Sequence, residues 1–123
     1  MRTLLLLLPL VACSLLLSAG CGKESPPPAV AVDQIAAGVP EAFKGAPAAV
    51  QTLVKEIVDA IGQQDFPTAW DKLQELNARP GLTDAQKEFV AGSIASVGAE
   101  VNKAESTGDE AAKQAIEFHR ANK

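Results

Sequence analysis

The 123-residue sequence has few of the side chains from which enzymes and metalloproteins build their sites. It contains one histidine, His119, and two cysteines, Cys13 and Cys21. A zinc site takes three or four Cys and His ligands, so we expect none. There is no GxxxxGK loop for phosphates and no GxSxG turn to present a serine nucleophile. We therefore expect a non-enzymatic protein without a cofactor or metal, in which His119 is a solvated or helix-end residue.

Positive charge is also scarce. The chain has 11 Lys and Arg against 15 Asp and Glu, a formal net charge of −4. Arg2 is the one charged residue among the first 20. The formal net charge is therefore −4 for the whole chain and −5 for the chain beyond residue 20. Binding to a phosphate backbone depends on concentrated Lys and Arg. Nucleic acid is therefore excluded as the expected partner.

No apolar run is long enough for a transmembrane helix, which takes about 20 residues. The run from Leu4 to Leu17 is shorter, contains Pro9 and ends in small residues. Arg2 precedes it, and a positive charge followed by a short apolar run is typical of an export signal. We expect residues 1–20 to be such a signal. Cys21 would then be the one cysteine left, so packing alone would hold the domain.

The residues Ser18-Ala19-Gly20-Cys21 end this signal. They resemble the lipobox of bacterial lipoproteins. The resemblance implies that a diacylglyceryl group is attached to the Cys21 sulfur and that a dedicated peptidase cuts before it. The mature lipoprotein would then be held at a membrane by fatty acyl chains such as palmitate. Two or more chains anchor a protein stably, because each buried methylene contributes about 0.8 kcal/mol.

A second sequence of this kind, Leu10-Val11-Ala12-Cys13, would leave a leader of only about 12 residues, at the lower limit for an export signal. Cys21 is therefore preferred to Cys13. The remaining alternative is an ordinary secreted protein with a free thiol. Gly22 stands where Asp favours retention at the inner membrane of diderm bacteria. The resemblance thus implies an outer-membrane lipoprotein of the cell envelope, on its periplasmic side or at the surface.

A proline-rich segment follows the cysteine. Pro26, Pro27 and Pro28 cannot form a helix and favour an extended polyproline II path, at about 3.1 Å per residue. We expect residues 21–32 to be the lipidated cysteine and a flexible tether, and residues 33–123 to be one small helical domain.

From residue 33 onward the apolar spacing is helical rather than alternating. Asp33, Asp65, Thr83 and Thr107 are the expected N-caps of four helices, and Pro47 is expected in the first turn of another. Thr83 and Gln86 have capping-box spacing and begin the longest helix. These signals predict an all-α fold, a small antiparallel bundle of three to five helices.

The central hairpin resembles a tetratricopeptide repeat over about 34 residues. Asp65-Phe66-Pro67-Thr68-Ala69 is similar to the turn and second-helix start of that repeat. Ile57 and Ala60 depart from its first-helix pattern, and Pro80 lies one position early. About three repeats are needed to build a solenoid. The resemblance therefore implies the geometry of a helical hairpin rather than a repeat protein.

Two features are candidates for contact with another molecule. Ala91, Ala95 and Gly98 form a strip of small residues on the longest helix, suited either to packing within the chain or to a homodimer or partner face. Trp70 is in phase with core positions and is either buried or an exposed binding hot spot. We expect a lipid-anchored protein acting by protein–protein contact or envelope scaffolding. The alternatives are a binder of a small apolar ligand and an inhibitor or immunity-type lipoprotein.

Overall fold

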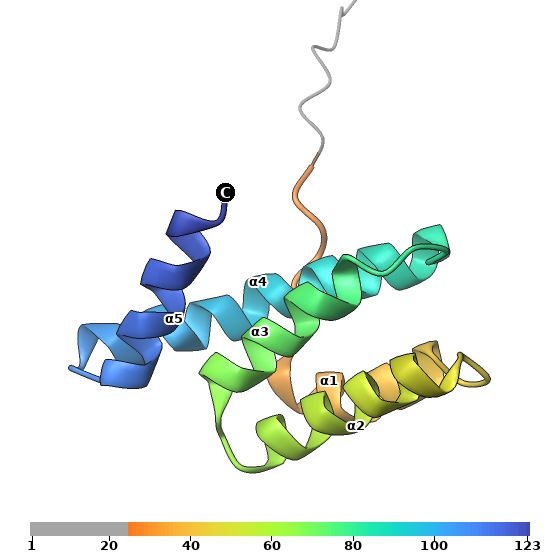
Figure 1. The fold of residues 1–123 in the computed structure, drawn as a ribbon, viewed down its shortest axis with the longest axis horizontal. Helices are drawn as coiled ribbons and strands as arrows, with labels where there is room; N and C mark the ends of the chain where they lie inside the picture. Colours follow the sequence, from red (N-terminus) through yellow and green to blue (C-terminus); the bar gives the residue numbers. More distant parts are fainter. Residues whose placement is uncertain (1–24) are drawn as a thin grey trace, which may run out of the picture.

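The computed structural model describes residues 25–123, and both cysteines lie outside this part of the chain. The described residues form an all-α bundle without strands, so the predicted fold class is confirmed (Figure 1). The helices are α1 (Val32–Ala42), α2 (Ala48–Gly62), α3 (Phe66–Asn77), α4 (Asp84–Ser106) and α5 (Glu110–Ala121).

Two of the predicted N-caps are confirmed. The Asp65 carboxylate accepts a hydrogen bond from the Thr68 backbone N–H at 3.3 Å and begins α3. At the start of α4, the Gln86 backbone N–H donates to the Thr83 hydroxyl at 3.1 Å, and the Gln86 side-chain oxygen accepts from the Thr83 N–H at 2.9 Å. This reciprocal capping box satisfies two backbone donors that the helix itself leaves unpaired.

The other two predicted caps are wrong. The N-cap of helix α1 is Ala31, two residues before the predicted cap, so Asp33 lies inside the first turn and caps nothing. Helix α5 is capped by Asp109, whose carboxylate accepts from the Ala112 N–H at 2.9 Å. The Thr107 hydroxyl instead donates to a carbonyl in the last turn of α4, at 2.8 Å. It therefore helps to end one helix rather than begin the next.

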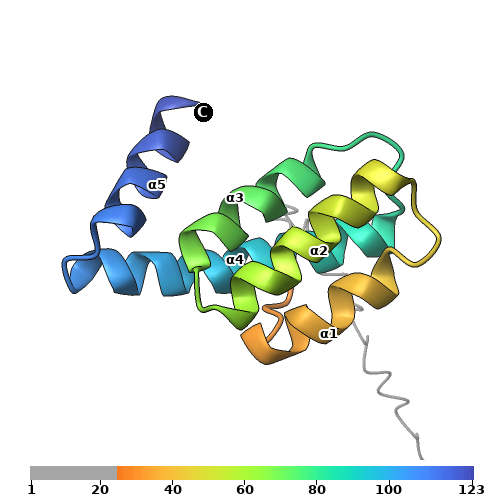
Figure 2. The ribbon, with the colours of Figure 1, turned by 60° about the horizontal axis from the view of Figure 1, so that its bottom comes forward.

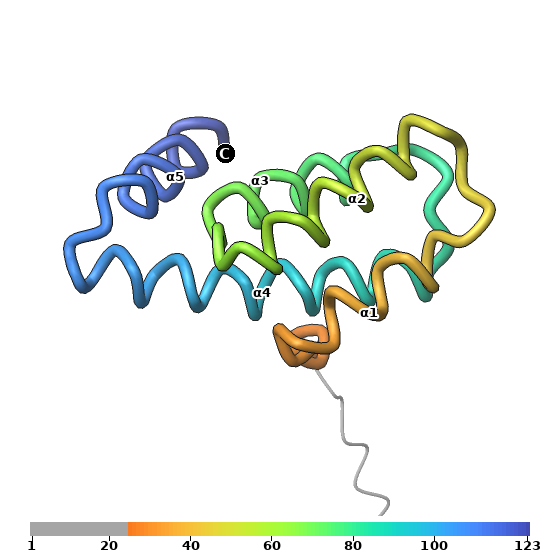
Figure 3. The backbone as a smooth tube through the Cα atoms, turned by 90° about the horizontal axis from the view of Figure 1, so that it is seen from below, coloured from red at the N-terminus to blue at the C-terminus, as the bar shows by residue number. Residues whose placement is uncertain are grey.

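Helices α2 and α3 form the predicted antiparallel hairpin (Figure 2). Only Gln63–Asp65 separate them, and Gln64 takes a positive φ of 58° to make the turn. Helix α4 packs against α1, α3 and α5, so the longest helix links the hairpin to α1 and to α5 (Figure 3). The Gln86 side-chain nitrogen also donates to the Ala42 carbonyl at 2.9 Å, which joins the start of α4 to the end of α1.

One apolar cluster receives side chains from all the helices and from the α1–α2 connection. Its largest fully buried members are Ile35, Val39, Phe43, Ile57, Leu73, Leu76, Val90, Val97 and Val101. Helix α5 contributes only Ala112 and Ile116 as buried residues. Helix α1 likewise has two buried residues, Ile35 and Val39, whereas the other three helices each have four or more.

Candidate functional site

Trp70 is buried, with 9% of its surface exposed. Its indole lies against Gly98 of α4: a Cβ at Gly98 would be 3.0 Å from the indole nitrogen, Nε1. That nitrogen has no hydrogen-bond partner in the described part of the chain. Of the two roles considered for Trp70, the structure therefore shows the buried one. The absence of a side chain at Gly98 is what lets the ring approach α4.

Of the two expectations for His119, the helix-end position is confirmed, since it lies in the last turn of α5, where it is half-buried rather than solvated. Its imidazole ring lies 4.7 Å from the Trp70 ring, centroid to centroid, with 51° between the two planes. This tilted contact joins the end of α5 to the middle of α3, and such aromatic pairs add about 0.5–1.5 kcal/mol beyond area burial. His119 therefore serves packing between helices in this structure.

The small residues of α4 do not present one continuous uncovered face. Gly98 is covered by Trp70, Ala91 is half-buried, and Ala95 is exposed. Gly92 was not among the predicted contact residues, yet a Cβ there would overlap the Pro28 carbonyl oxygen and lie 3.0 Å from a Val30 methyl carbon. A glycine inside a helix, costly by about 1 kcal/mol relative to alanine, was the available signal of this close approach.

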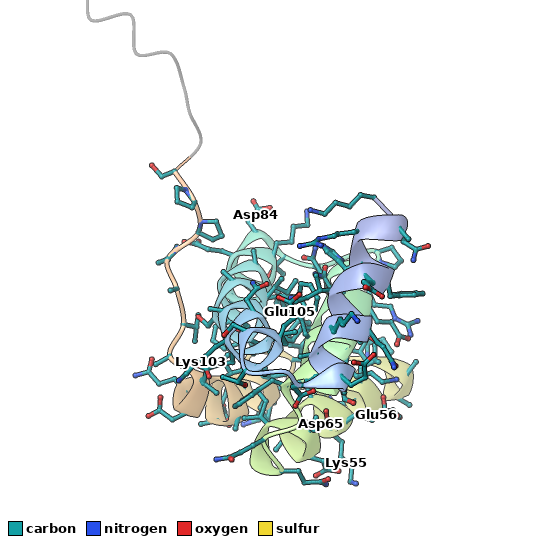
Figure 4. All side chains as sticks on the ribbon, turned by 90° about the vertical axis from the view of Figure 1, so that its left-hand side faces the viewer. Lys55, Glu56, Asp65, Asp84, Lys103 and Glu105 are labelled. Carbon is teal, nitrogen blue, oxygen red and sulfur yellow. The ribbon has the colours of Figure 1, made fainter. Side chains whose placement is uncertain are left out.

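The chain before α1 therefore packs on α4 from Pro28 onward, within the segment expected to be the tether. Figure 4 shows α4 nearly end-on, with this segment along one side and α5 on the other. A shallow hollow of about 590 Å³ lies between Pro26–Pro28 and α4, and Ala91 lines it. The segment before α1 and α5 thus lie on different sides of the same helix.

An ion-pair network joins the middle of α2 to α3. The Lys72 ammonium lies 3.0 Å from a Glu56 carboxylate oxygen and 3.6 Å from one of Glu75. The hydrogen bond to Glu56, followed by the charges of Glu56 and Glu75, raises the pKa of Lys72 above its ordinary value, although partial burial opposes the shift. Arg79 also contacts Glu75, at 3.0 Å. This network holds two helices together and leaves its members paired.

Nothing in residues 25–123 assembles three or more His, Cys, Asp and Glu side chains in a position to hold a metal ion. Among the same residues, no helix is both long and apolar enough to cross a membrane. The hollows recorded by the structure lie at its surface and are bordered mainly by exposed or half-exposed residues, while the apolar cluster occupies the interior.

The most distinctive surface lies between α3 and α5. Phe118 is 63% exposed and is the one exposed large hydrophobic residue among those described. A hollow of about 480 Å³ lies on one side of it and a hollow of about 440 Å³ on the other, and Asp71 and Phe118 border both. We call this pair of hollows the α3–α5 furrow. The sequence signal for it was the spacing of Ala111, Ala115 and Phe118, which places them on one face of α5.

Comparison of the chain with protein-family models, with curated proteins and with solved structures finds no match in any of the three.

Proposed function

We propose that this chain is a bacterial lipoprotein, anchored through Cys21, whose helical domain acts by non-catalytic contact with another protein of the cell envelope. The anchor is supported by the order of the sequence features: one charge, an apolar run, the lipobox-like residues and a proline-rich segment. The contact role is supported by a single observation, the exposed Phe118 within the α3–α5 furrow. Aromatic residues, phenylalanine included, are enriched in the cores of protein interfaces.

A binder of small apolar ligands has less support. Such a protein needs an apolar cavity of some 300 Å³ or more that encloses most of the ligand. Here the interior positions between the helices are filled by the chain's own side chains. An inhibitor or immunity-type lipoprotein is a special case of the proposed contact, in which the partner is an enzyme.

The anchor is tested by metabolic labelling with radioactive palmitate. The full chain should incorporate label, Cys21→Ala should not, and the matched variant Cys13→Ala should label like the unmodified chain. Equal labelling of Cys21→Ala and the unmodified chain would show that the anchor lies elsewhere.

The contact role is tested with a photoreactive amino acid placed at position 118 of the full chain in growing cells. Irradiation should join the chain covalently to another protein. The control position is Ala49, which is exposed on α2 and far from α5 in sequence. A protein adduct should form at 118 and not at 49. If position 118 gives no adduct, the proposed contact role is refuted.

A further inference from the structure

The segment before α1 is part of the folded domain from Pro28 onward. Gly92 is buried beneath it, and a Cβ there would overlap the Pro28 carbonyl oxygen. The Val30 side chain is half-buried and packs against the apolar cluster. The Ala31 carbonyl accepts two hydrogen bonds from the first turn of α1, at 2.9 and 3.2 Å, so the segment runs directly into that helix. We call residues 28–31 the docked segment.

The docked segment shortens the part of the chain that is free to act as a tether. Cys21 lies seven residues before Pro28, so the chain between them reaches at most about 25 Å, whatever path it takes. A tether that stayed free as far as Val32 would span eleven residues and reach about 40 Å. Packing on α4 therefore removes about 15 Å of the reach that the sequence alone allows.

The chain leaves the bundle on the side away from α2. Figure 1 shows the described segment passing α4 and pointing away from α2, and Figure 4 shows the same direction from another side. Asp84, at the start of α4, lies toward this exit, whereas Lys55 on α2 lies on the opposite side of the domain (Figure 4). We call the side that carries Asp84 the exit side.

A domain held by so short a chain cannot turn over freely. Residues 25–28, which include three prolines, continue in the exit direction and border a hollow on α4. To bring α2 toward a bilayer, the chain would have to reverse near these prolines, whose rings fix φ at about −65°, and run back beside α4 and α1. Each of these helices is about 10 Å in diameter, so the detour would use most of the reach of about 25 Å. A free tether of about 40 Å would permit it.

We propose that the docked segment fixes how the domain sits on the membrane, with the exit side facing the bilayer and α2 facing away. This proposal rests on the lipid anchor at Cys21 and specifies the bilayer-facing surface for it. The acyl chains supply the affinity, because Asp84, Lys87 and Glu88 give the exit side charges of both signs. The packing of the docked segment on α4 supplies the orientation, since it leaves too little free chain for the domain to turn over.

The test uses the full chain, isolated with its acyl groups and bound to the outside of phosphatidylcholine vesicles whose headgroups carry an acceptor dye. A donor dye is attached through Asp84→Cys or, in a second protein, through Lys55→Cys; both residues are exposed and they lie on opposite sides of the domain (Figure 4). Lipidation blocks the Cys21 sulfur and processing removes Cys13, so only the introduced thiol takes the dye. Flotation with the vesicles is measured first, and energy transfer second.

Two variants release the constraint in different ways. Gly92→Val displaces the docked segment and frees the chain as far as Val32, and circular dichroism checks that this variant remains folded. An insertion of about 12 Gly and Ser residues after Gly22 lengthens the tether by roughly 20 Å and leaves α4 untouched. Gly62→Val is the matched control, because no atom lies within 4 Å of its Cβ position.

Energy transfer should be greater from position 84 than from position 55 of the unmodified chain. Gly92→Val and the insertion should each reduce that difference by about half or more, because the added reach lets the domain turn over. Gly62→Val should preserve the difference. Equal transfer from the two positions, or a difference that survives either change in a folded protein, would overturn the inference and leave the anchor standing. A chain that does not float with the vesicles would refute the anchor itself, and the inference with it.

Discussion

Replacing Gly98 by valine tests the packing that positions α5. The Trp70 ring lies so close to α4 that a Cβ at Gly98 would be 3.0 Å from Nε1 and 3.4 Å from the adjoining ring carbon, Cε2. Valine would place two further methyl groups near this contact. The indole must then move away from α4, and because the ring also contacts His119, the movement disturbs the end of α5.

Two opposing effects set the size of the change. Valine is favoured over glycine inside a helix by a few tenths of a kcal/mol, whereas overpacking a filled site costs about 1–3 kcal/mol. The second effect is larger, so we expect a net loss of about 2 kcal/mol in the free energy of unfolding. For a domain of this size, such a loss lowers Tm by about 10 °C.

The matched control is Gly62→Val. Gly62 is the last residue of α2, has no atom within 4 Å of the position of its Cβ, and does not have a positive φ. The same substitution there should leave Tm within about 2 °C of the unmodified protein. Thermal unfolding of both variants is followed by circular dichroism, and the emission of Trp70, the one tryptophan in the chain, reports its solvation. If the two variants unfold at the same temperature, Trp70 is not packed on α4 and the reasoning fails.

Three further predictions follow from other contacts. Lys72→Met should lower the free energy of unfolding by less than about 1 kcal/mol, because the ion pairs are partly exposed. Since folding raises the pKa of Lys72, its contribution is complete below about pH 10.5 and is lost as the pH rises through the folded-state pKa. The urea midpoints of the two proteins should therefore converge in strongly alkaline solution, and a constant difference would contradict the assignment. Gly92→Val should displace Pro28 and Val30 from α4 and weaken the nuclear Overhauser contacts between the Val30 methyl groups and α4; unchanged contacts would contradict this. Phe118→Ser should change the free energy of unfolding by no more than about 0.5 kcal/mol, because the ring is exposed, and a loss above 1 kcal/mol in urea unfolding would contradict this.

The local elements of the fold could be predicted because their causes are local. The 3.6-residue spacing of apolar side chains located the helices. The capping box of Thr83 and Gln86 depends on residues only three apart, so the sequence specifies it directly. The error at α5 has a local cause too: Thr107 and Asp109 are both good caps. Gly108 takes a φ of 92°, and the chain turns there before Asp109 begins the helix.

The long-range contacts could not be predicted, because each depends on how the helices pack. Trp70, Gly98 and His119 belong to three different helices, and their sequence positions alone do not show that they meet. The contact of Pro28 with Gly92 joins positions 64 residues apart. The three prolines predicted an extended spacer, but they could not predict that the end of this segment packs against α4.

The exposure of Phe118 has a structural cause in the way α5 is held. Helix α5 buries only Ala112 and Ile116 and packs against α3 and α4 alone, so most of its surface is uncovered. Isolated helices of 12 residues are marginal in water and depend on tertiary packing for their stability. A partner bound in the α3–α5 furrow would cover a second face of α5 and thereby stabilise the helix that presents Phe118. Partner binding and the docking of α5 onto the bundle would then be coupled. A partner that binds only when α5 is docked adds its binding free energy to the free energy that holds α5 in place.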